Sequence, residues 1–253
     1  MIKIKAVILC AGYATRLYPL TLNTPKSLLE VGNKAILGHL LDKIEKVKEI
    51  KEVFIISNHR FFEQFRVWLN HYESKKKIKL LNDGTLSNED RLGAIGDLNF
   101  VLKEEDIKDD LLVIAGDNLF VFSLEEFVEF YKKNKTSQVA FCDLKNKELV
   151  KRKFGVGILE KNCVVNFEEK PWEPKSSLAA TACYLFKKED LSLIGSLISQ
   201  GQIDAPGHLI KWLVENSKVN GFVSEKSWYD IGSHESLKEA QEDYSKIKEN
   251  NQR

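Results

Sequence analysis

The chain has 253 residues, of which 43% are hydrophobic and 30% charged, so it is long enough for one large domain or two small ones with a substantial core. Its 38 Lys and Arg residues and 37 Asp and Glu residues give a formal net charge of +1. This balance argues against a general nucleic-acid or anionic-membrane binder, because such proteins need a basic surplus.

The N-terminal stretch "MIKIKAVILC" has an apolar run of about six residues and no small-residue cleavage site, so it predicts a buried strand rather than a signal peptide. No apolar run in the chain approaches the roughly 20 residues of a membrane span. The four cysteines, Cys10, Cys142, Cys163 and Cys183, include no CxxC pair. Free thiols in a reducing cytoplasm are the simplest interpretation, so we expect a cytoplasmic protein without a membrane partner.

Apolar runs and amphipathic stretches then alternate along the first half of the chain. A long loop leads to "AILGHLLDKIEKV", whose apolar residues recur at helical spacing, followed by "VFIIS", by "FFEQFRVWLNHY" and by "IKLLN". A polar loop and "GAIGDLNFVL" precede "LLVIAGD". The strand candidates are almost wholly apolar, as expected of parallel strands covered on both faces. We therefore predict an α/β fold with a doubly wound, mostly parallel sheet.

Ser123 and Glu126 have capping-box spacing and predict a helix through about Asn134. The alternation of strand-like and helical segments changes after about residue 150. Beyond it, "FGVGILE", "VVNFEEK" and "AATACYLF" are strand-like without intervening helices, which predicts an antiparallel excursion attached to the parallel sheet.

Two helices are predicted near the end of the chain. Pro206 suits the first turn of a helix over 206–216. A second helix is expected over 235–247, with Leu237, Ala240, Tyr244 and Ile247 on one face. No linker rich in Gly, Ser or Pro and no internal repeat is present, so we predict a single domain over residues 1–253.

The loop "AGYATRLYPLTLNTPK" follows the first strand, where open α/β sheets bind ligands. Gly12 allows close approach of a ligand to the backbone, and Arg16 offers a planar fork of donors for phosphate oxygens. Pro19 and Pro25 stiffen the chain before Lys26. The alternative is an ordinary strand-to-helix connection, but a connection of some 25 residues is unusual in a compact domain and favours phosphate binding.

Other nucleotide-binding loops are absent. No GxGxxG follows the first strand, and "IISNH" ends the second strand without an acidic residue, which disfavours a hydride-transferring Rossmann enzyme. GxxxxGK[ST] is also missing, so the chain is not a P-loop enzyme.

Two aspartates end strand candidates. Asp117 in "VIAGDN" and Asp230 in "SWYDIGS" offer hard oxygen ligands that suit Mg²⁺ beside phosphates, although turn or helix-cap roles compete. In "NFEEKPW", Lys170 precedes Pro171 and has an extended backbone preference. Glu169 and Lys170 form a weak signal by themselves, because charged residues at strand ends are mostly solvated.

In combination these segments resemble the sugar-1-phosphate nucleotidyltransferases, or NDP-sugar pyrophosphorylases, which include glucose-1-phosphate thymidylyltransferases. "AGYATRLYPLT…TPKSLLEVGNKAIL" is similar to the signature GGxGTRLxPLTxxxPKxLLxVxxKPxL of that family. "LLVIAGDN", "VVNFEEKPWEPKSSLAATACYLF" and "SWYDIGSHESLKEA" resemble its later motifs in the same order, over residues 4–242. The resemblance implies a nucleotide-binding part over about 1–150 and a sugar-phosphate-binding part over about 151–235.

The resemblance also implies roles for individual residues. Arg16, Lys26 and Lys170 would be catalytic, with Lys170 holding the sugar phosphate, and Asp117 and Asp230 would bind Mg²⁺. The nucleotide would contact Leu9, Ala11, Gly12, Arg16, Lys26, Asn88 and Gly93. The sugar phosphate would contact Gly155, Glu169, Lys170, Ala180 and Tyr184.

The chain departs from the family pattern at a few positions. Ala11 and Ala14 stand where glycines are usual, which we expect to be tolerated only if both avoid positive φ. Ala182 replaces a glycine beside the sugar pocket. Asn88 has the spacing of the base-reading glutamine, but Asn82 competes for that role.

The implied reaction converts an NTP (UTP, dTTP or CTP) and a sugar 1-phosphate into an NDP-sugar and pyrophosphate. We expect these two substrates and Mg²⁺ as partners, no nucleic acid, and leave a homo-oligomer open. A cytidylyltransferase acting on a phospho-alcohol such as phosphocholine is an alternative, and a silent nucleotide- or sugar-phosphate-binding regulatory module is another. A glycosyltransferase is disfavoured because "GDN" lacks a DxD-type metal site.

Overall fold

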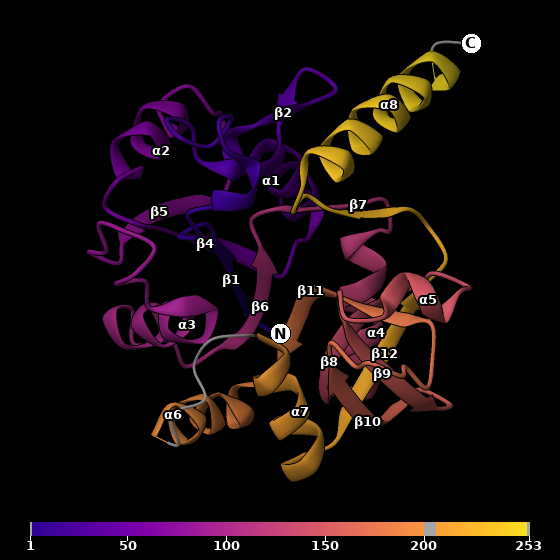
Figure 1. The fold of residues 1–253 in the computed structure, drawn as a ribbon. Coiled ribbons are helices and arrows are strands. Elements are labelled where there is room, and N and C mark those ends of the chain that lie inside the picture. The colour runs from indigo at the N-terminus through magenta and orange to yellow at the C-terminus, as the bar shows by residue number, and fades with distance from the viewer. Residues whose placement is uncertain (1, 200–205, 252–253) are drawn as a thin grey trace.

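A mixed nine-stranded sheet forms the centre of the computed structural model, which describes residues 2–199 and 206–251 (Figure 1). In spatial order its strands are β5 (Lys77–Asn82), β4 (Ile50–Ser57), β1 (Ile4–Leu9), β6 (Asp110–Ala115), β11 (Leu178–Phe186), β8 (Ser137–Asp143), β12 (Val219–Ser224), β10 (Cys163–Glu169) and β9 (Gly155–Glu160). β5, β4, β1 and β6 pair in parallel, as do β8 and β12. The predicted α/β fold with a doubly wound sheet is therefore confirmed, but the sheet is mixed rather than mostly parallel, because β9, β10 and β11 pair antiparallel with their neighbours.

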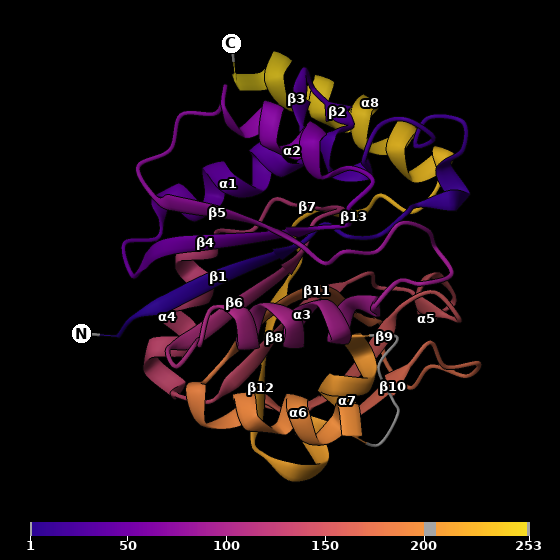
Figure 2. The same cartoon turned by 90° about the vertical axis from the view of Figure 1, so that its left-hand side faces the viewer.

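Helices cover both faces of this sheet (Figure 2). α1 (Ile36–Lys46), α2 (Phe62–Leu69) and α4 (Leu124–Asn134) pack on one face, and α3 (Gly93–Glu104), α6 (Leu191–Ser199) and α7 (Pro206–Asn216) pack on the other. Alternate strand residues enter the two cores, as the two-residue period of a strand requires. In β1, Ala6 and Ile8 join the first core, and Val7 joins the second.

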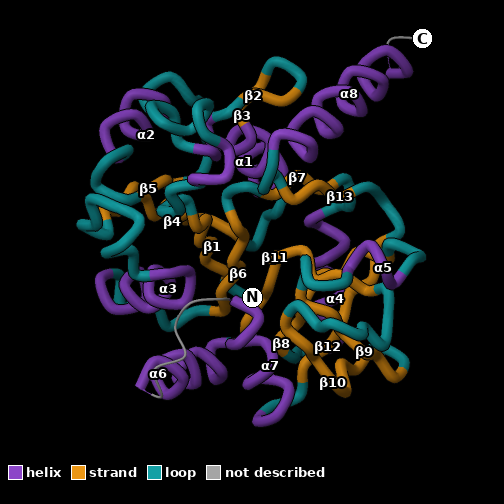
Figure 3. The backbone as a smooth tube through the Cα atoms, in the orientation of Figure 1, coloured by secondary structure: helices purple, strands orange, loops and turns teal. Residues whose placement is uncertain are grey.

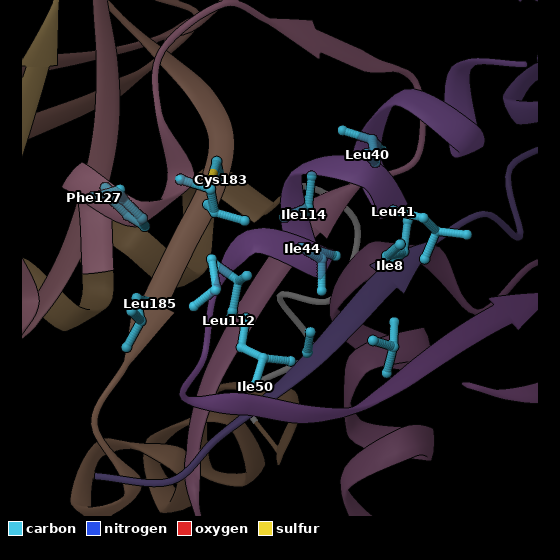
Figure 4. Close-up of a cluster of buried hydrophobic side chains, with 14 of the residues drawn as sticks. Ile8, Leu40, Leu41, Ile44, Ile50, Leu112, Ile114, Phe127, Cys183 and Leu185 are labelled. Carbon is cyan, nitrogen blue, oxygen red and sulfur yellow. The ribbon is translucent and has the colours of Figure 1, made fainter. Parts of the chain in front are cut away.

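Figure 4 shows part of the first core, where Ile8 and Ile114 from neighbouring strands lie among side chains of α1. Cys183 from β11 belongs to the same core and is fully buried. All four cysteines are free thiols, as the absence of a CxxC pair predicts.

Short elements complete the fold, and long loops join them (Figure 3). β7 (Asn118–Phe120) pairs with β13 (Trp228–Asp230), and β2 (Glu30–Val31) pairs with β3 (Lys34–Ala35). α5 (Lys147–Val150) and the 3-10 turns η1 (Thr15–Leu17), η2 (Lys26–Leu28) and η3 (Lys188–Asp190) lie in connections. α8 (His234–Asn251) buries Leu237 and Ala240 with residues of β7 and β13.

The prediction for the second half of the chain needs one correction. β9 and β10 form an antiparallel ladder, as predicted. β11 does not belong to an excursion alone: it lies between β6 and β8 in the main sheet, antiparallel to both. β8 and β12, which the pattern did not reveal, extend the sheet on the far side of β11.

The helices predicted over 206–216 and up to Asn134 end where expected, whereas α8 runs from His234 to Asn251, four residues beyond its predicted end. Ser123 accepts a hydrogen bond from the Glu126 amide and caps α4, and α7 begins at Pro206. The side chains of Tyr244 and Ile247 lie outside the described ones. Within residues 2–199 and 206–251, no helix combines the length and apolar character that a membrane crossing needs.

Candidate active site

A cavity of about 870 Å³ opens at the carboxyl ends of β1 and β6 and extends to β10, β11 and β13. Its volume is typical of sites for small molecules. The predicted site residues line it with one exception, Asn88: they are Leu9, Ala11, Gly12, Arg16, Lys26, Gly93, Asp117, Gly155, Glu169, Lys170, Ala180, Tyr184 and Asp230. Residues far apart in sequence thus meet around one space.

The long loop after β1 forms one wall of this cavity. Tyr18, which precedes Pro19, has an extended backbone, and the Tyr18–Pro19 peptide is cis. The expectation that Ala14 avoids positive φ is wrong, because its φ is 50° and its ψ 42°. A hydrogen bond of 2.8 Å from Thr21 Oγ1 to the Ala14 carbonyl helps to hold this left-handed turn, in which a small methyl group costs less than a larger side chain.

The short β7–β13 ladder brings the two predicted metal ligands together. Asn118 pairs with Asp230, and the Ile231 amide donates to the Asp117 carbonyl over 3.1 Å. Asp117 forms an ion pair with Lys26, so its carboxylate does not act as a helix cap. Asp230 does not cap α8 either, because Ser233 accepts the hydrogen bond from the Ser236 amide.

Asp230 lies in a strongly polarised environment. Burial and the nearby Asp117 carboxylate raise the pKa of Asp230 to about 6, while Lys26, Arg16 and Lys170 oppose the shift. Arg16 lies beside Gly232 and Asp230: a Cβ at that glycine would lie 3.3 Å from the guanidinium and 3.6 Å from Asp230 Oδ2. Three cations and two carboxylates therefore act on one part of the cavity.

These two carboxylates fit the divalent cation that the resemblance implies. Asp117 and Asp230 repel each other inside a partly buried site, and a cation between them would relieve that repulsion. Among the described residues no group of three or more His, Cys, Asp or Glu side chains could hold a metal. Mg²⁺ commonly binds one or two carboxylates and completes its octahedron with substrate phosphates and water, so two acidic ligands suffice for it.

The far end of the cavity is built around Glu169. Burial raises the pKa of the Glu169 carboxyl, against the influence of Lys170 and His208. A Cβ on Gly155 would lie 3.0 Å from Glu169 Oε2, and one on Gly207 would lie only 1.7 Å away. Glycine at both positions leaves room for this carboxyl group. The sequence analysis names Gly155 only as a residue that lines the sugar pocket, and it does not name Gly207.

The predicted extended backbone at Lys170 is wrong: this residue follows β10 with a φ of 46°, in the left-handed region. A hydrogen bond of 3.2 Å from the Lys170 amide to the Phe154 carbonyl holds the turn. The Lys170 ammonium lies 3.8 Å from Glu169 Oε1 and is half-exposed. Ala182 also has a left-handed backbone, with a φ of 50°. Asn118 donates to the carbonyls of Thr181 and Ala182 and accepts from Trp228 Nε1, which fixes this kink in β11.

Neither asparagine proposed to read the base lines the cavity. Asn82 contacts His59 Nδ1 over 2.9 Å and accepts from the Gly84 amide, so its side chain holds a turn. The Asn88 carbonyl accepts from Arg91. The cavity wall here includes Arg91, just before α3, and Gly93, Ala94 and Asp97, which share one face of α3.

Sequence reasoning also missed Gly116, which positions Asp117. A Cβ at Gly116 would lie 2.4 Å from Cys10 Sγ, 2.7 Å from Ser27 Oγ and 2.8 Å from the Leu9 carbonyl oxygen. β6 can approach β1 this closely only with a glycine there. The sequence "GDN" places this glycine directly before Asp117, and that position could have indicated a close approach of two strands.

Comparisons with known proteins agree with this geometry. The model of the family described as nucleotidyl transferase matches residues 5–247. The chain is 33% identical over 234 residues to the bifunctional protein GlmU of Methanocaldococcus jannaschii, covering 90% of this chain and 51% of that protein. It is 29% identical over 235 residues to a mannose-1-phosphate guanyltransferase of Debaryomyces hansenii, covering 90% of this chain and 61% of the relative. The chain thus spans little more than half the length of these relatives.

Solved structures show the same fold. One is a Bacillus anthracis protein whose assignment as a glucose-1-phosphate thymidylyltransferase is provisional, determined in complex with sucrose. It superposes with a TM-score of 0.82 at 25% identity, over 95% of each chain. A UDP-glucose pyrophosphorylase complexed with UDP-glucose has a TM-score of 0.80 at 19% identity, over 98% of this chain and 100% of that one.

Proposed function

Because the chain belongs to the nucleotidyl transferase family, we propose that it transfers a nucleotidyl group from an NTP to a sugar 1-phosphate, releasing pyrophosphate. The observation that carries the proposal is the single cavity that joins Arg16, Lys26 and the two aspartates to Glu169 and Lys170. One end has the charges for a triphosphate, and the other has a buried carboxyl group and a lysine for a phosphorylated sugar.

The proposed reaction is an in-line substitution at the α-phosphorus of the NTP. An oxygen of the sugar phosphate forms the new P–O bond, and the bond from the α-phosphorus to the bridging oxygen breaks. The electron pair of that bond leaves with pyrophosphate, so atoms and charge balance. A phosphate monoester is already anionic at neutral pH, and no residue has to act as a general base.

The chain's own residues would act by positioning and by charge. Two polyanions must meet in this step, and Arg16 and Lys26 would offset the charge that develops on the leaving pyrophosphate. Lys170 would hold the attacking phosphate, and Glu169 would accept hydrogen bonds from sugar hydroxyl groups. Mg²⁺ bound by Asp117 and Asp230 would neutralise phosphate oxygens and orient them.

The cavity walls support a sugar rather than a small phospho-alcohol as acceptor. Gly155 and Gly207 leave the space around the Glu169 carboxyl open, and the Tyr184 side chain closes that region with only 5% of its surface exposed. A polar group at this depth needs a hydrogen-bonding ligand, and sugar hydroxyls provide several donors.

A matrix of pyrophosphate-release assays with Mg²⁺ tests the proposal. UTP, dTTP, CTP, GTP and ATP would each be combined with glucose, N-acetylglucosamine and mannose 1-phosphates and with phosphocholine. We expect turnover with at least one sugar 1-phosphate. Turnover with phosphocholine only would favour the cytidylyltransferase, and NTP binding without turnover on any acceptor would favour the silent regulatory module.

A further inference from the structure

Asp97 is a buried acidic residue of the cavity to which neither the family motifs nor the proposed reaction assigns a role. It lies one turn after Gly93 on α3, lines the cavity and is 6% exposed. Its environment is not that of the phosphate-binding residues. It faces a second carboxyl group, Asp83, in the loop after β5.

The Asp97 and Asp83 carboxyl groups lie close enough to influence each other's pKa and to share a proton. Burial and the Asp83 charge raise the pKa of Asp97 to about 8, so Asp97 carries the proton at neutral pH. Asp97 Oδ1 and Asp83 Oδ2 are buried and have no other partner among the described residues, so they are the two oxygens that this proton would join. Asp97 Oδ2 is then left for a ligand, as an acceptor in a neutral carboxylic acid.

Asp83 is held in place by the loop that follows it. The Thr85 amide and hydroxyl both donate to Asp83 Oδ1, over 2.7 and 2.8 Å. Thr85 Oγ1 also lies 3.1 Å from the hydroxyl group of Tyr13 in the phosphate-binding loop. The acid pair is therefore part of a hydrogen-bonded network that includes Thr85 and Tyr13.

The residues that line the cavity together with Asp97 suit a flat ring. Small or apolar residues of this lining are Leu9, Ala11, Gly12, Gly93, Ala94 and Ala115, and Arg91 also lines the cavity. Beyond the adjacent residues, no heavy atom of the described part of the chain lies within 4 Å of the position that a Cβ would take at Gly12, so the backbone there is open to close approach. A heterocyclic base has apolar faces and a polar edge, and Asp97 would meet that edge.

We propose that Asp97 determines nucleobase specificity, with Oδ2 accepting a hydrogen bond from an imino or amino N–H on the edge of the base. This inference deepens the proposed function and rests on it. A neutral acid suits the position, because an ionised carboxylate would repel the triphosphate of the same ligand. Base recognition then comes from α3 rather than from Asn82 or Asn88, whose side chains do not line the cavity.

Binding measurements separate this role from a structural one. Titration calorimetry in the presence of Mg²⁺ would compare the wild type, Asp97→Leu and Asp97→Asn with five NTPs and with inorganic tripolyphosphate. For Asp97→Leu we expect Kd for the preferred NTP to rise roughly tenfold or more, because a base N–H loses its partner, while Kd for tripolyphosphate stays within twofold. Asp97→Asn should stay close to the wild type, since its amide can donate to Asp83 and keep an acceptor for the base.

Other outcomes overturn the inference. Equal loss of NTP and tripolyphosphate binding in Asp97→Leu would mean that Asp97 only holds the long loop after β1 in place, through Asp83, Thr85 and Tyr13. A loss that disappears with the 2′,3′-dideoxynucleotide would assign Asp97 to the ribose. If the wild type binds no NTP at all, the proposed function fails first.

An experiment on the wild type keeps the inference testable if Asp97→Leu does not fold. The preferred nucleotide would be replaced by its form methylated at the base nitrogen, such as 3-methyluridine triphosphate for UTP or 1-methylguanosine triphosphate for GTP. We expect binding at least tenfold weaker for a base read through that N–H. Unchanged binding of the forms methylated at the imino and at the amino nitrogen would contradict the assignment.

Discussion

Lys26 and Asp117, 91 residues apart in the chain, form an ion pair inside the cavity. Their side chains are 16% and 23% exposed, so water screens the pair only partly. In the proposed reaction the same carboxylate binds Mg²⁺ and the same ammonium contacts phosphate. Each group therefore has one partner in the free protein and another in the substrate complex.

Replacing Lys26 by Met should change metal binding and turnover in opposite directions. Without the ammonium, Asp117 and Asp230 attract a cation more strongly, so we expect tighter Mn²⁺ or Mg²⁺ binding by calorimetry. The kcat should fall by roughly 10²-fold, since one charge that stabilises the transition state is lost. Asp143→Asn is the matched control, because Asp143 also ends a strand but bonds to Ser177 outside the cavity. Weaker metal binding in Lys26→Met would contradict the shared carboxylate.

Removal of the divalent cation should abolish turnover. With excess EDTA, we expect pyrophosphate release to stop and to return on addition of Mg²⁺, because two adjacent carboxylates and a triphosphate need a cation to coexist. Asp117→Asn should raise the Mg²⁺ concentration for half-maximal activity and lower kcat. Full activity in EDTA would exclude the metal role of Asp117 and Asp230.

Arg16→Ala should lower kcat by roughly 10²–10³, the effect of losing one preorganised donor to a developing charge. Arg16 lies beside Gly232 and Asp230, so its guanidinium already faces the reacting region. Arg66→Ala serves as the control, since Arg66 pairs with Glu63 on the surface of α2. Near-normal kcat of Arg16→Ala, measured with saturating substrates, would show that Arg16 does not stabilise the transition state.

The sequence predicted best those elements that have a local pattern, such as a run of apolar residues or a helix cap. Apolar runs of parallel strands and the Ser123 cap predicted their elements directly. β8 and β12 were missed because their burial depends on β11, which enters the sheet between β6 and β8 from a distant part of the chain. The spacing of hydrophobic residues within one segment does not indicate which distant strand that segment pairs with.

In the site, too, local motifs predicted some features, and long-range contacts could not be predicted. Motifs in the loop and at strand ends predicted the residues that meet in the cavity, but not the contacts between them, such as that of Lys26 with Asp117. Spacing suggested Asn88 as the base reader, whereas the fold turns Asp97 toward the cavity. A partner such as Asp83 can be recognised only when the loop and α3 are placed together.

The acid pair predicts how stability depends on pH. The pKa of Asp97 is about 8 in the folded protein, because of burial and the Asp83 charge, and roughly 3.9 in an unfolded chain. The folded state then holds the extra proton between these values, so the contribution of Asp97 to stability is complete below about pH 4 and is lost as pH rises through about 8. Urea unfolding at pH 6 and pH 9 should show a larger loss for the wild type than for Asp97→Asn, which cannot ionise. Parallel curves for the two proteins would disprove the shared proton.

Glu169→Gln should affect the acceptor more than the nucleotide. Glutamine fits the space beside Gly155 and Gly207 but replaces one acceptor oxygen by a donor, so hydroxyl groups of the sugar lose a partner. We expect KM for the sugar 1-phosphate to rise roughly tenfold and KM for the NTP to change less than twofold. Glu168→Gln is the control, because Glu168 pairs with Lys175 and does not line the cavity. Equal changes in both KM values would argue against a sugar site at Glu169.

Gly116→Ala should destabilise the protein and displace Asp117. The added methyl group would lie 2.4 Å from Cys10 Sγ and 2.8 Å from the Leu9 carbonyl oxygen, and the backbone atom cannot move aside without shifting β1. Overpacking of this kind typically costs about 1–3 kcal/mol, and we expect a lower Tm together with weaker Mg²⁺ binding. Gly195→Ala is the control: apart from the backbone of α6 and the two adjacent residues, no described atom lies within 4 Å of its Cβ position, so alanine should raise stability by roughly 0.5–1 kcal/mol through helix propensity. A Gly116→Ala protein with unchanged Tm and metal affinity would show that β1 and β6 can separate at this point, and that the glycine does not position Asp117.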